Sequence, residues 1–167
     1  MFMRSPRLFL RPPFPEDGQD FAAAMTGAGL LHRVKPVDAE ALPAMAVRTA
    51  PGRSVACYPR LAITLPTTAG APLIGVGALL RRAHGTELVC GIVPDMRGRG
   101  FATEAVLALL EIASVIGHRI VIALPFGDDP AGGRVLEKAG FGFDSGTSAY
   151  RIDLGELSER VFIPAAA

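Results

Sequence analysis

The chain has 167 residues, of which half are hydrophobic and a fifth are charged. That length and composition fit one globular domain with a sizeable core, and they exclude a disordered chain. The net charge of +1 favours no strongly charged partner, so we expect no nucleic-acid binding. We expect a single domain over residues 1–167, with a core over about 7–154.

The sequence also argues against export and against insertion into a membrane. The start MFMRSPRLFLRPP has no apolar run long enough for a signal peptide, and no segment approaches the roughly 20 apolar residues of a membrane span. Cys57 and Cys90 form no disulfide framework, and the spacing of His and Cys suits no metal. We therefore expect a cytoplasmic protein with reduced thiols and no metal, in which His32, His84 and His118 are surface or loop residues.

The first half of the chain predicts strands that pair with their neighbours in sequence. Alternating apolar residues, interrupted by Pro and Gly turns, are typical of strands joined by hairpins. The stretch from Leu30 to Cys57 is ambiguous, with one helix indicated inside it. The predicted elements are a strand over 7–11, a helix over 17–25, a helix over 39–47, and hairpin strands over 60–65 and 73–81.

The second half predicts a parallel crossover. The segment 119–124 (RIVIAL) is apolar on both faces, which is typical of a central parallel strand. Asp129-Pro130 is a helix start and Gly140 a helix stop. The predicted elements are strands over 87–93, 119–124 and 150–154 and helices over 103–116 and 130–140. The fold class that follows is mixed α/β, with a partly antiparallel sheet and flanking helices.

The strongest chemical signal is the loop VPDMRGRGFATE, residues 93–104, between a strand and a long amphipathic helix. Glycines let the backbone approach a ligand closely, and the first N–H groups of the helix have no partner within it. Such a helix start binds phosphate readily, and Arg97 and Arg99 could add charge-assisted contacts. A plain strand-to-helix loop with solvated arginines explains the same residues.

Two other phosphate motifs fit this loop less well. Gly98, Gly100 and Ala102 imitate a dinucleotide-binding fingerprint, but that fingerprint belongs to the first strand–helix turn and needs an acidic residue after the next strand. Three strands come before the strand that leads into this loop, and RIVIAL ends without an acid. A P-loop is excluded because no Gly-Lys-Ser/Thr follows.

The loop and a second block together resemble the GNAT N-acetyltransferase superfamily. Arg97, Gly100 and Ala102 match its pyrophosphate motif R/Q-x-x-G-x-G/A, and Asp129-Pro130-Ala131 with the segment 134–141 (RVLEKAGF) is similar to its second block N-P-A-S-x-R-V-L-E-K-x-G-F. The stretches 87–105, 7–12 and 73–77 look like the branch of the ribosomal-protein N-terminal acetyltransferases. The resemblance covers about residues 7–154.

The resemblance implies two central parallel strands that splay apart, with acetyl-CoA as co-substrate in the gap and an amine as acceptor. It implies that the pantetheine arm pairs with the strand and that the pyrophosphate rests on the loop and the helix start. The cofactor-binding residues implied are Ile92, Val93, Arg97, Gly98, Arg99, Gly100, Phe101, Ala102, Thr103 and Asp129.

This chain departs from the family pattern at several positions of the site. Asp129 and Gly132 replace the usual Asn and Ser, and Leu136 stands where many members carry a tyrosine as general acid. Cys90 and Gly91 replace aromatic residues, and we expect these smaller side chains to open the acceptor pocket or to loosen it.

Glu87 is the candidate general base, because it is the carboxylate at the start of the strand expected to border the cleft. An exposed strand-end carboxylate is the competing interpretation. No base stands beside either cysteine, so we expect direct transfer without an acyl-enzyme.

Two functions stay open at this point. The first is an N-acetyltransferase acting on a primary amine, either a protein N-terminus or a small molecule. The second is a catalytically silent acyl-CoA-binding module of the same fold. The sequence leaves the acceptor open, and it allows a monomer or a homodimer.

Overall fold

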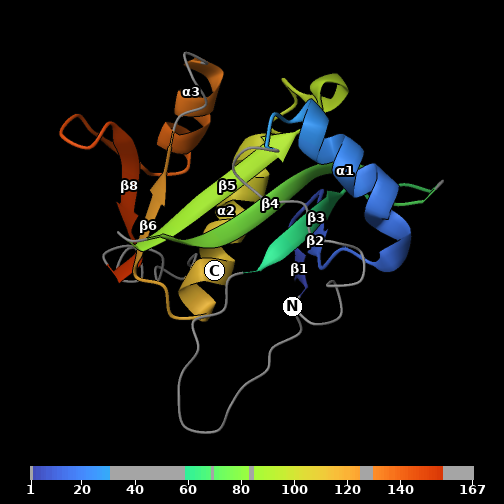
Figure 1. Ribbon diagram of the computed structural model, residues 1–167, viewed down its shortest axis with the longest axis horizontal. Coiled ribbons are helices and arrows are strands. Elements are labelled where there is room, and N and C mark those ends of the chain that lie inside the picture. The colour runs from blue at the N-terminus through green and yellow to red at the C-terminus, as the bar shows by residue number, and fades with distance from the viewer. Residues whose placement is uncertain (1, 31–58, 69, 83–84, 125–129, 156–167) are drawn as a thin grey trace, which may run out of the picture.

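A computed structural model describes residues 2–30, 59–68, 70–82, 85–124 and 130–155. In this part of the chain one sheet of eight strands runs in the order β1-β2-β3-β4-β5-β6-β8-β7 (Figure 1). The strands are β1 (Met3–Arg4), β2 (Phe9–Arg11), β3 (Arg60–Thr64), β4 (Leu73–Arg82), β5 (Gly85–Ile92), β6 (Ile120–Ala123), β7 (Gly142–Asp144) and β8 (Ala149–Asp153). The helices are α1 (Gly18–Gly27), α2 (Phe101–Val115) and α3 (Pro130–Lys138).

The first five strands form an antiparallel meander. The predicted hairpin is confirmed as β3 and β4, which pair antiparallel from Arg60↔Ala78 to Thr64↔Leu73. β4 is a continuous apolar run because both of its faces are buried: every residue from Ile74 to Leu80 is buried. The mixed α/β fold class is thereby confirmed.

β5 and β6 are the central parallel pair, and they separate soon after they meet. Only Thr86↔Val121 and Glu87↔Ile122 are paired between them. Beyond that point β5 stays with β4 as far as Gly75↔Ile92, while β6 stays with β8 as far as Ala123↔Tyr150. The splayed strands expected from the sequence are therefore present, and they open a fork in the sheet.

Helices cover both faces of the sheet (Figure 1). α1 packs Phe21, Ala24 and Met25 on one face, against a cluster that includes Val76 and Val89. α2 packs on the opposite face, where its buried residues join Leu136 and Phe141 from α3 and the segment after it. Leu109 of α2 is fully buried. A side chain of that size contributes about 2–3 kcal/mol through removal from water, so these clusters fix the helices that border the fork.

The differences from the predicted elements lie at short strands and at ends. β1 and β7 were not expected, because two or three residues are too few to show a period. The helix predicted over 39–47 lies outside the described residues. His118 lies in the loop between α2 and β6, in agreement with the expectation of a surface or loop residue, but its side chain is buried and its Nδ1 lies 3.0 Å from the Thr86 hydroxyl. None of the helices described has the length and apolar character of a membrane span.

Candidate acyl-CoA cleft

The loop between β5 and α2 needs its two glycines for conformational reasons. Gly98 and Gly100 have φ angles of 74° and 79°, in the left-handed region that other residues rarely adopt. Gly100 caps α2, so the helix begins at Phe101, two residues earlier than predicted. The first N–H groups of a helix have no acceptor within the helix, and the residues that carry them in α2 line the cleft beside β5.

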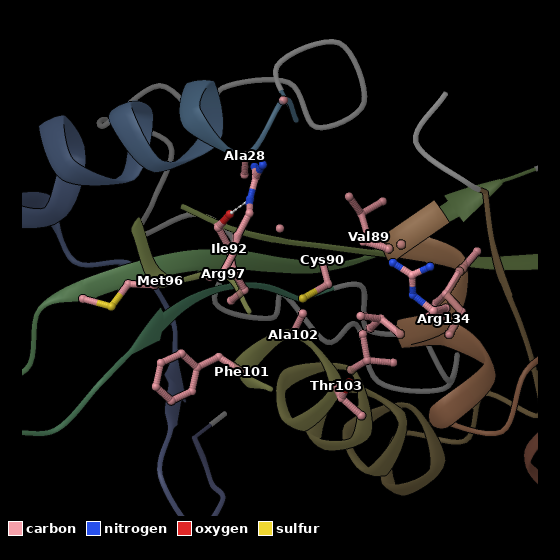
Figure 2. A pocket seen from close by; sticks show the side chains of 18 of the residues that line it. Ala28, Val89, Cys90, Ile92, Met96, Arg97, Phe101, Ala102, Thr103 and Arg134 are labelled. Atoms are coloured by element: carbon pink, nitrogen blue, oxygen red, sulfur yellow. Dashed lines mark hydrogen bonds between the residues drawn. The ribbon is translucent and has the colours of Figure 1, made fainter. Parts of the chain in front are cut away.

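A cleft of about 590 Å³ lies at this point, between the fork and the starts of two helices (Figure 2). Strand β5 contributes one wall through residues 88–92, and Ala123 and Leu124 follow from β6. The start of α2 lines one end, α3 lines another part, and residues 26–29 at the end of α1 close the far side. Such a concave site with apolar walls and few polar groups is typical of a small-molecule pocket.

Most of the predicted cofactor residues meet in this cleft. Those in its lining are Ile92, Arg97, Gly98, Gly100, Phe101, Ala102 and Thr103. Val93, Arg99 and Glu87 are not among the lining residues. Asp129 lies outside the described residues. The structure therefore brings together the loop, the helix start and the strand end from one continuous segment.

Arg97 connects parts of the cleft wall to one another. Its Nε donates to the Ile92 carbonyl at 2.9 Å, and one terminal nitrogen donates to the Gly27 carbonyl at 3.0 Å (Figure 2). Two of its five N–H groups are thereby used inside the protein. The guanidinium fixes the end of α1 against the end of β5, which keeps the two sides of the cleft together.

The small residues of β5 do not act as the sequence suggested. A Cβ placed on Gly91 would lie 2.5 Å from the Ala28 Cβ and 3.0 Å from a Leu30 methyl carbon. The expectation that Gly91 opens the acceptor pocket is therefore wrong, because the segment after α1 fills that space. Cys90 does line the cleft, and burial raises the pKa of its thiol to about 12.

Residues without a site role in the sequence analysis also line the cleft. Ala28 and its neighbours lie at the end of α1, about 65 residues before the loop. Arg134 and Lys138 come from α3, and their i, i+4 spacing puts both cations on one helix face. Within the described residues neither cation has an ion pair. The spacing was readable from the sequence, but only the fold shows that this face borders the cleft.

Glu87 stands at the fork itself. It is 2% exposed, opposite Ile122 at the last parallel pair, and ion-paired with Arg82. Alternation along β5 puts its side chain on the same face of the sheet as Val89, which packs with α1. It is thus neither an exposed strand-end carboxylate nor part of the cleft lining.

Leu136 takes the place expected for a tyrosine in α3, and it is buried in the cleft wall. One turn away, the hydroxyl of Tyr150 would lie 2.6 Å from a Cβ on Gly133, so glycine at this position makes room for the phenol. Tyr150 itself packs in the core and is not among the lining residues.

Comparison with known proteins identifies the family. The model of the acetyltransferase (GNAT) domain matches residues 7–142. A GNAT-family acetyltransferase from Bacillus anthracis superposes with a TM-score of 0.65 at 18% identity, over 92% of this chain and 98% of that one. An acetyltransferase from Agrobacterium tumefaciens gives 0.62 at 23% identity, over 91% and 94%.

A Vibrio cholerae protein described as a ribosomal-protein-serine acetyltransferase also has this fold, with a TM-score of 0.65 at 12% identity, over 92% of this chain and 97% of that one. No protein with a curated description matches the chain. The match of the family model over most of the sequence shows that the chain belongs to the GNAT acetyltransferases, the family that transfers acyl groups from acetyl-CoA.

Proposed function

We propose that the protein is an N-acetyltransferase that moves the acetyl group of acetyl-CoA directly onto a primary amine. The observation that carries this proposal is the fork between β5 and β6, which opens beside the glycine loop and the start of α2. The acceptor is a protein N-terminus or a small-molecule amine. We also propose that the protein is cytoplasmic and that it acts as a monomer or a homodimer.

The pantetheine arm would pair with the side of β5 that β6 leaves. Val93 donates its N–H to the Ile74 carbonyl, so it faces β4. In an antiparallel pair the hydrogen-bonded positions alternate, and the register Gly75↔Ile92 then turns the backbone groups of Ile92, Cys90 and Leu88 toward the fork. This supports Ile92 as a pantetheine contact, and it favours Cys90 over Val93 as the second.

The phosphates would meet the amides of the loop and of the first turn of α2. Anions are stabilised there by unpaired N–H groups and by the positive end of the helix dipole. Arg134 and Lys138 on the opposite wall add positive charge. The acyl end then extends into the fork, toward the position of Glu87.

In the reaction, the neutral amine nitrogen attacks the thioester carbonyl carbon, and the carbon–sulfur bond breaks. The new amide forms as the amine loses a proton to a base, and the thiolate leaves with or without a proton from water. We propose Glu87 as that base, acting directly or through water, because it stands where the strands part. Backbone N–H groups of β5 would stabilise the developing oxyanion.

One observation favours the second candidate, a silent acyl-CoA-binding module. Leu136 cannot donate a proton to the leaving thiolate. The two functions differ in one measurement, the release of free coenzyme A thiol when the protein is mixed with acetyl-CoA and a panel of amines. Acetyl-CoA binding without release by any amine would support the silent module.

Binding to the helix start is tested by adding a negative charge there. Ala102 is half-buried, lies in the first turn of α2 and lines the cleft. An acidic side chain at a helix start favours the helix, so Ala102→Glu should fold well while it repels the phosphates. We expect the Kd for acetyl-CoA to rise at least tenfold, measured by calorimetry. Ala102→Gln, of the same size but neutral, is the matched control, and equal affinities for the two variants would refute the assignment.

A further inference from the structure

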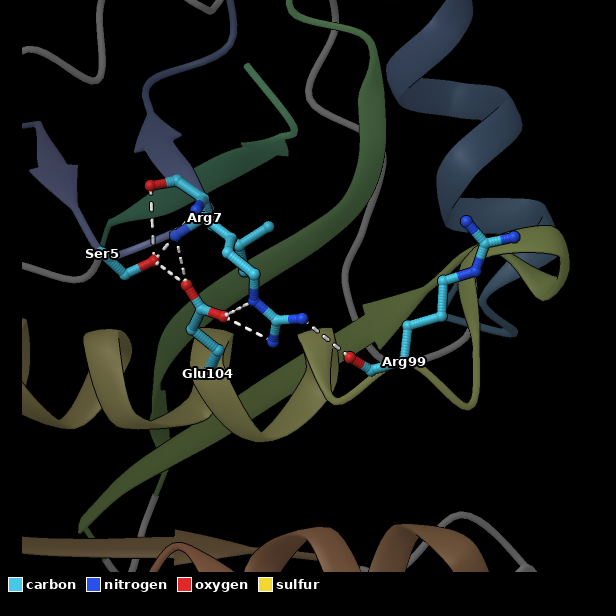
Figure 3. Close-up of polar contacts among 5 residues, drawn as sticks. Ser5, Arg7, Arg99 and Glu104 are labelled. Carbon is cyan, nitrogen blue, oxygen red and sulfur yellow. Dashed lines mark hydrogen bonds and ion pairs between the residues drawn. The ribbon is translucent and has the colours of Figure 1, made fainter. Parts of the chain in front are cut away.

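The turn between β1 and β2 holds the phosphate loop through a polar network. Glu104, in the first turn of α2, accepts hydrogen bonds from the Ser5 hydroxyl at 2.7 Å and from the Arg7 backbone N–H at 2.8 Å (Figure 3). The Arg7 side chain pairs with the same carboxylate through its Nε at 2.7 Å and its Nη2 at 2.7 Å. Its Nη1 donates to the Arg99 carbonyl at 3.0 Å. The Arg7 guanidinium thus contacts both the first turn of α2 and the loop before it, although Arg7 lies more than 90 residues earlier in the sequence.

The bond to Arg99 has a consequence for the cleft. The peptide group is planar and trans, so the carbonyl of Arg99 and the N–H of Gly100 point in opposite directions. Because Arg7 holds that carbonyl on its own side, the N–H of Gly100 is turned to the other side, and Gly100 is part of the cleft lining. The guanidinium also lies 4.7 Å from the centre of the Phe101 ring, the first residue of α2.

Arg7 also neutralises a charge that would oppose phosphate. Burial raises the pKa of Glu104, but hydrogen bonds from Ser5 and Arg7 outweigh it and hold that pKa below its usual value, so the carboxylate is ionised. Glu104 lies one helical turn from Gly100, since the backbone N–H of Glu104 donates to the Gly100 carbonyl. Without Arg7 an uncompensated negative charge would stand beside the amides that would meet the phosphates.

We propose that Arg7 is a positioning residue for acetyl-CoA: it orients the Arg99–Gly100 peptide and cancels the charge of Glu104, while touching no substrate itself. This inference rests on the proposed function, since it assigns the phosphate-binding amides to this loop. Arginine is required because its planar fork reaches a carboxylate and a carbonyl at once. A lysine at position 7 could keep the ion pair with Glu104. Its compact ammonium group could not also reach the Arg99 carbonyl, so that hydrogen bond would be lost.

The test measures acetyl-CoA affinity and kinetics in a set of variants. We expect Arg7→Met to raise the Kd and the KM for acetyl-CoA about tenfold, the value of one charge-assisted hydrogen bond, with a smaller change in kcat. Arg7→Lys should fall between Arg7→Met and wild type. In Arg7→Met/Glu104→Gln, affinity should partly recover, because the uncompensated carboxylate is gone. Arg4→Met, at an exposed position on β1, removes the same charge and should match wild type.

Hydrogen exchange of the free protein separates this inference from the proposed function. Arg7→Met should speed exchange of the segment 97–103, whereas Arg4→Met should not. If wild type binds no acetyl-CoA, the proposed function fails, and the exchange data still decide whether Arg7 holds the loop. Wild-type affinity in Arg7→Met, no recovery in the double variant, or unchanged exchange of the loop would each overturn the inference.

Discussion

Replacing Glu87 with glutamine separates a catalytic role from a structural one. The glutamine keeps the shape of the side chain and an acceptor for Arg82, but it cannot take a proton. If Glu87 is the base, kcat should fall about 10²-fold, which corresponds to roughly 2.7 kcal/mol in the barrier. The effect on folding should be smaller, because the neutral amide costs less to bury than a carboxylate at this position, where the side chain is 3% exposed, and it can still accept from Arg82.

The assay is the release of coenzyme A thiol as a function of pH at saturating substrates. Only the neutral amine attacks, so the loss in Glu87→Gln should shrink as the pH rises and more acceptor is already deprotonated. Arg82→Gln is the matched control, since it removes the same ion pair and leaves the carboxylate. We expect it to lower the melting temperature more than Glu87→Gln does, because it removes the ion pair from a buried carboxylate, and yet to retain much more of its kcat. Wild-type kcat in Glu87→Gln across the pH range, or equal losses in both variants, would refute the assignment.

Three further predictions concern a thiol, an ion pair and a cation. Because burial raises the pKa of Cys90 to about 12, its thiol is neutral at pH 7, so Cys90→Ala should keep kcat within about tenfold and mass spectrometry should find no acetyl-cysteine in wild type. A hydrogen bond from Arg11 lowers the pKa of Asp17. Asp17→Asn should therefore lower the melting temperature at pH 7, and the difference from wild type should vanish as pH falls below about 4 and through that lowered pKa. Arg134→Gln should weaken coenzyme A binding about tenfold and flatten its salt dependence, whereas Arg4→Gln should leave both unchanged.

Much of the fold was predictable because its elements are long enough to show a period. The predicted ends of β4 and α2 lie within two residues of the observed ends. Burial on both faces of the strand and on one face of the helix determines their composition. β7 has three residues and depends on pairing with β8, from Gly142↔Arg151 to Asp144↔Ala149. No local pattern indicates such a strand, because its stability comes from its neighbour.

The part of the candidate site that comes from one continuous segment was predictable. The part that is built from segments far apart in the sequence was not. The glycine loop and the start of α2 follow from one segment, whose positive φ angles only glycine adopts readily. The closure of the cleft by Ala28 depends on how α1 packs against β5, which no spacing reveals. The burial of the His118 side chain was not predictable for a similar reason: the residue lies in the loop after α2, and its partner Thr86 is 32 residues away.

The contacts of the loop arginines differ from those that the sequence motif suggested. Two cations beside glycines suggested direct phosphate contacts, yet Arg97 uses its side chain to hold the Ile92 and Gly27 carbonyls, and the Arg99 side chain is exposed and outside the lining. We propose that the backbone amides are the main phosphate-binding groups of this segment. Amides aim correctly only if their peptides are held, because a loop with two left-handed glycines has much freedom to lose. In this proposal Arg97, and Arg7 from the distant β1–β2 turn, act on phosphate chiefly by restricting the backbone that would bind it.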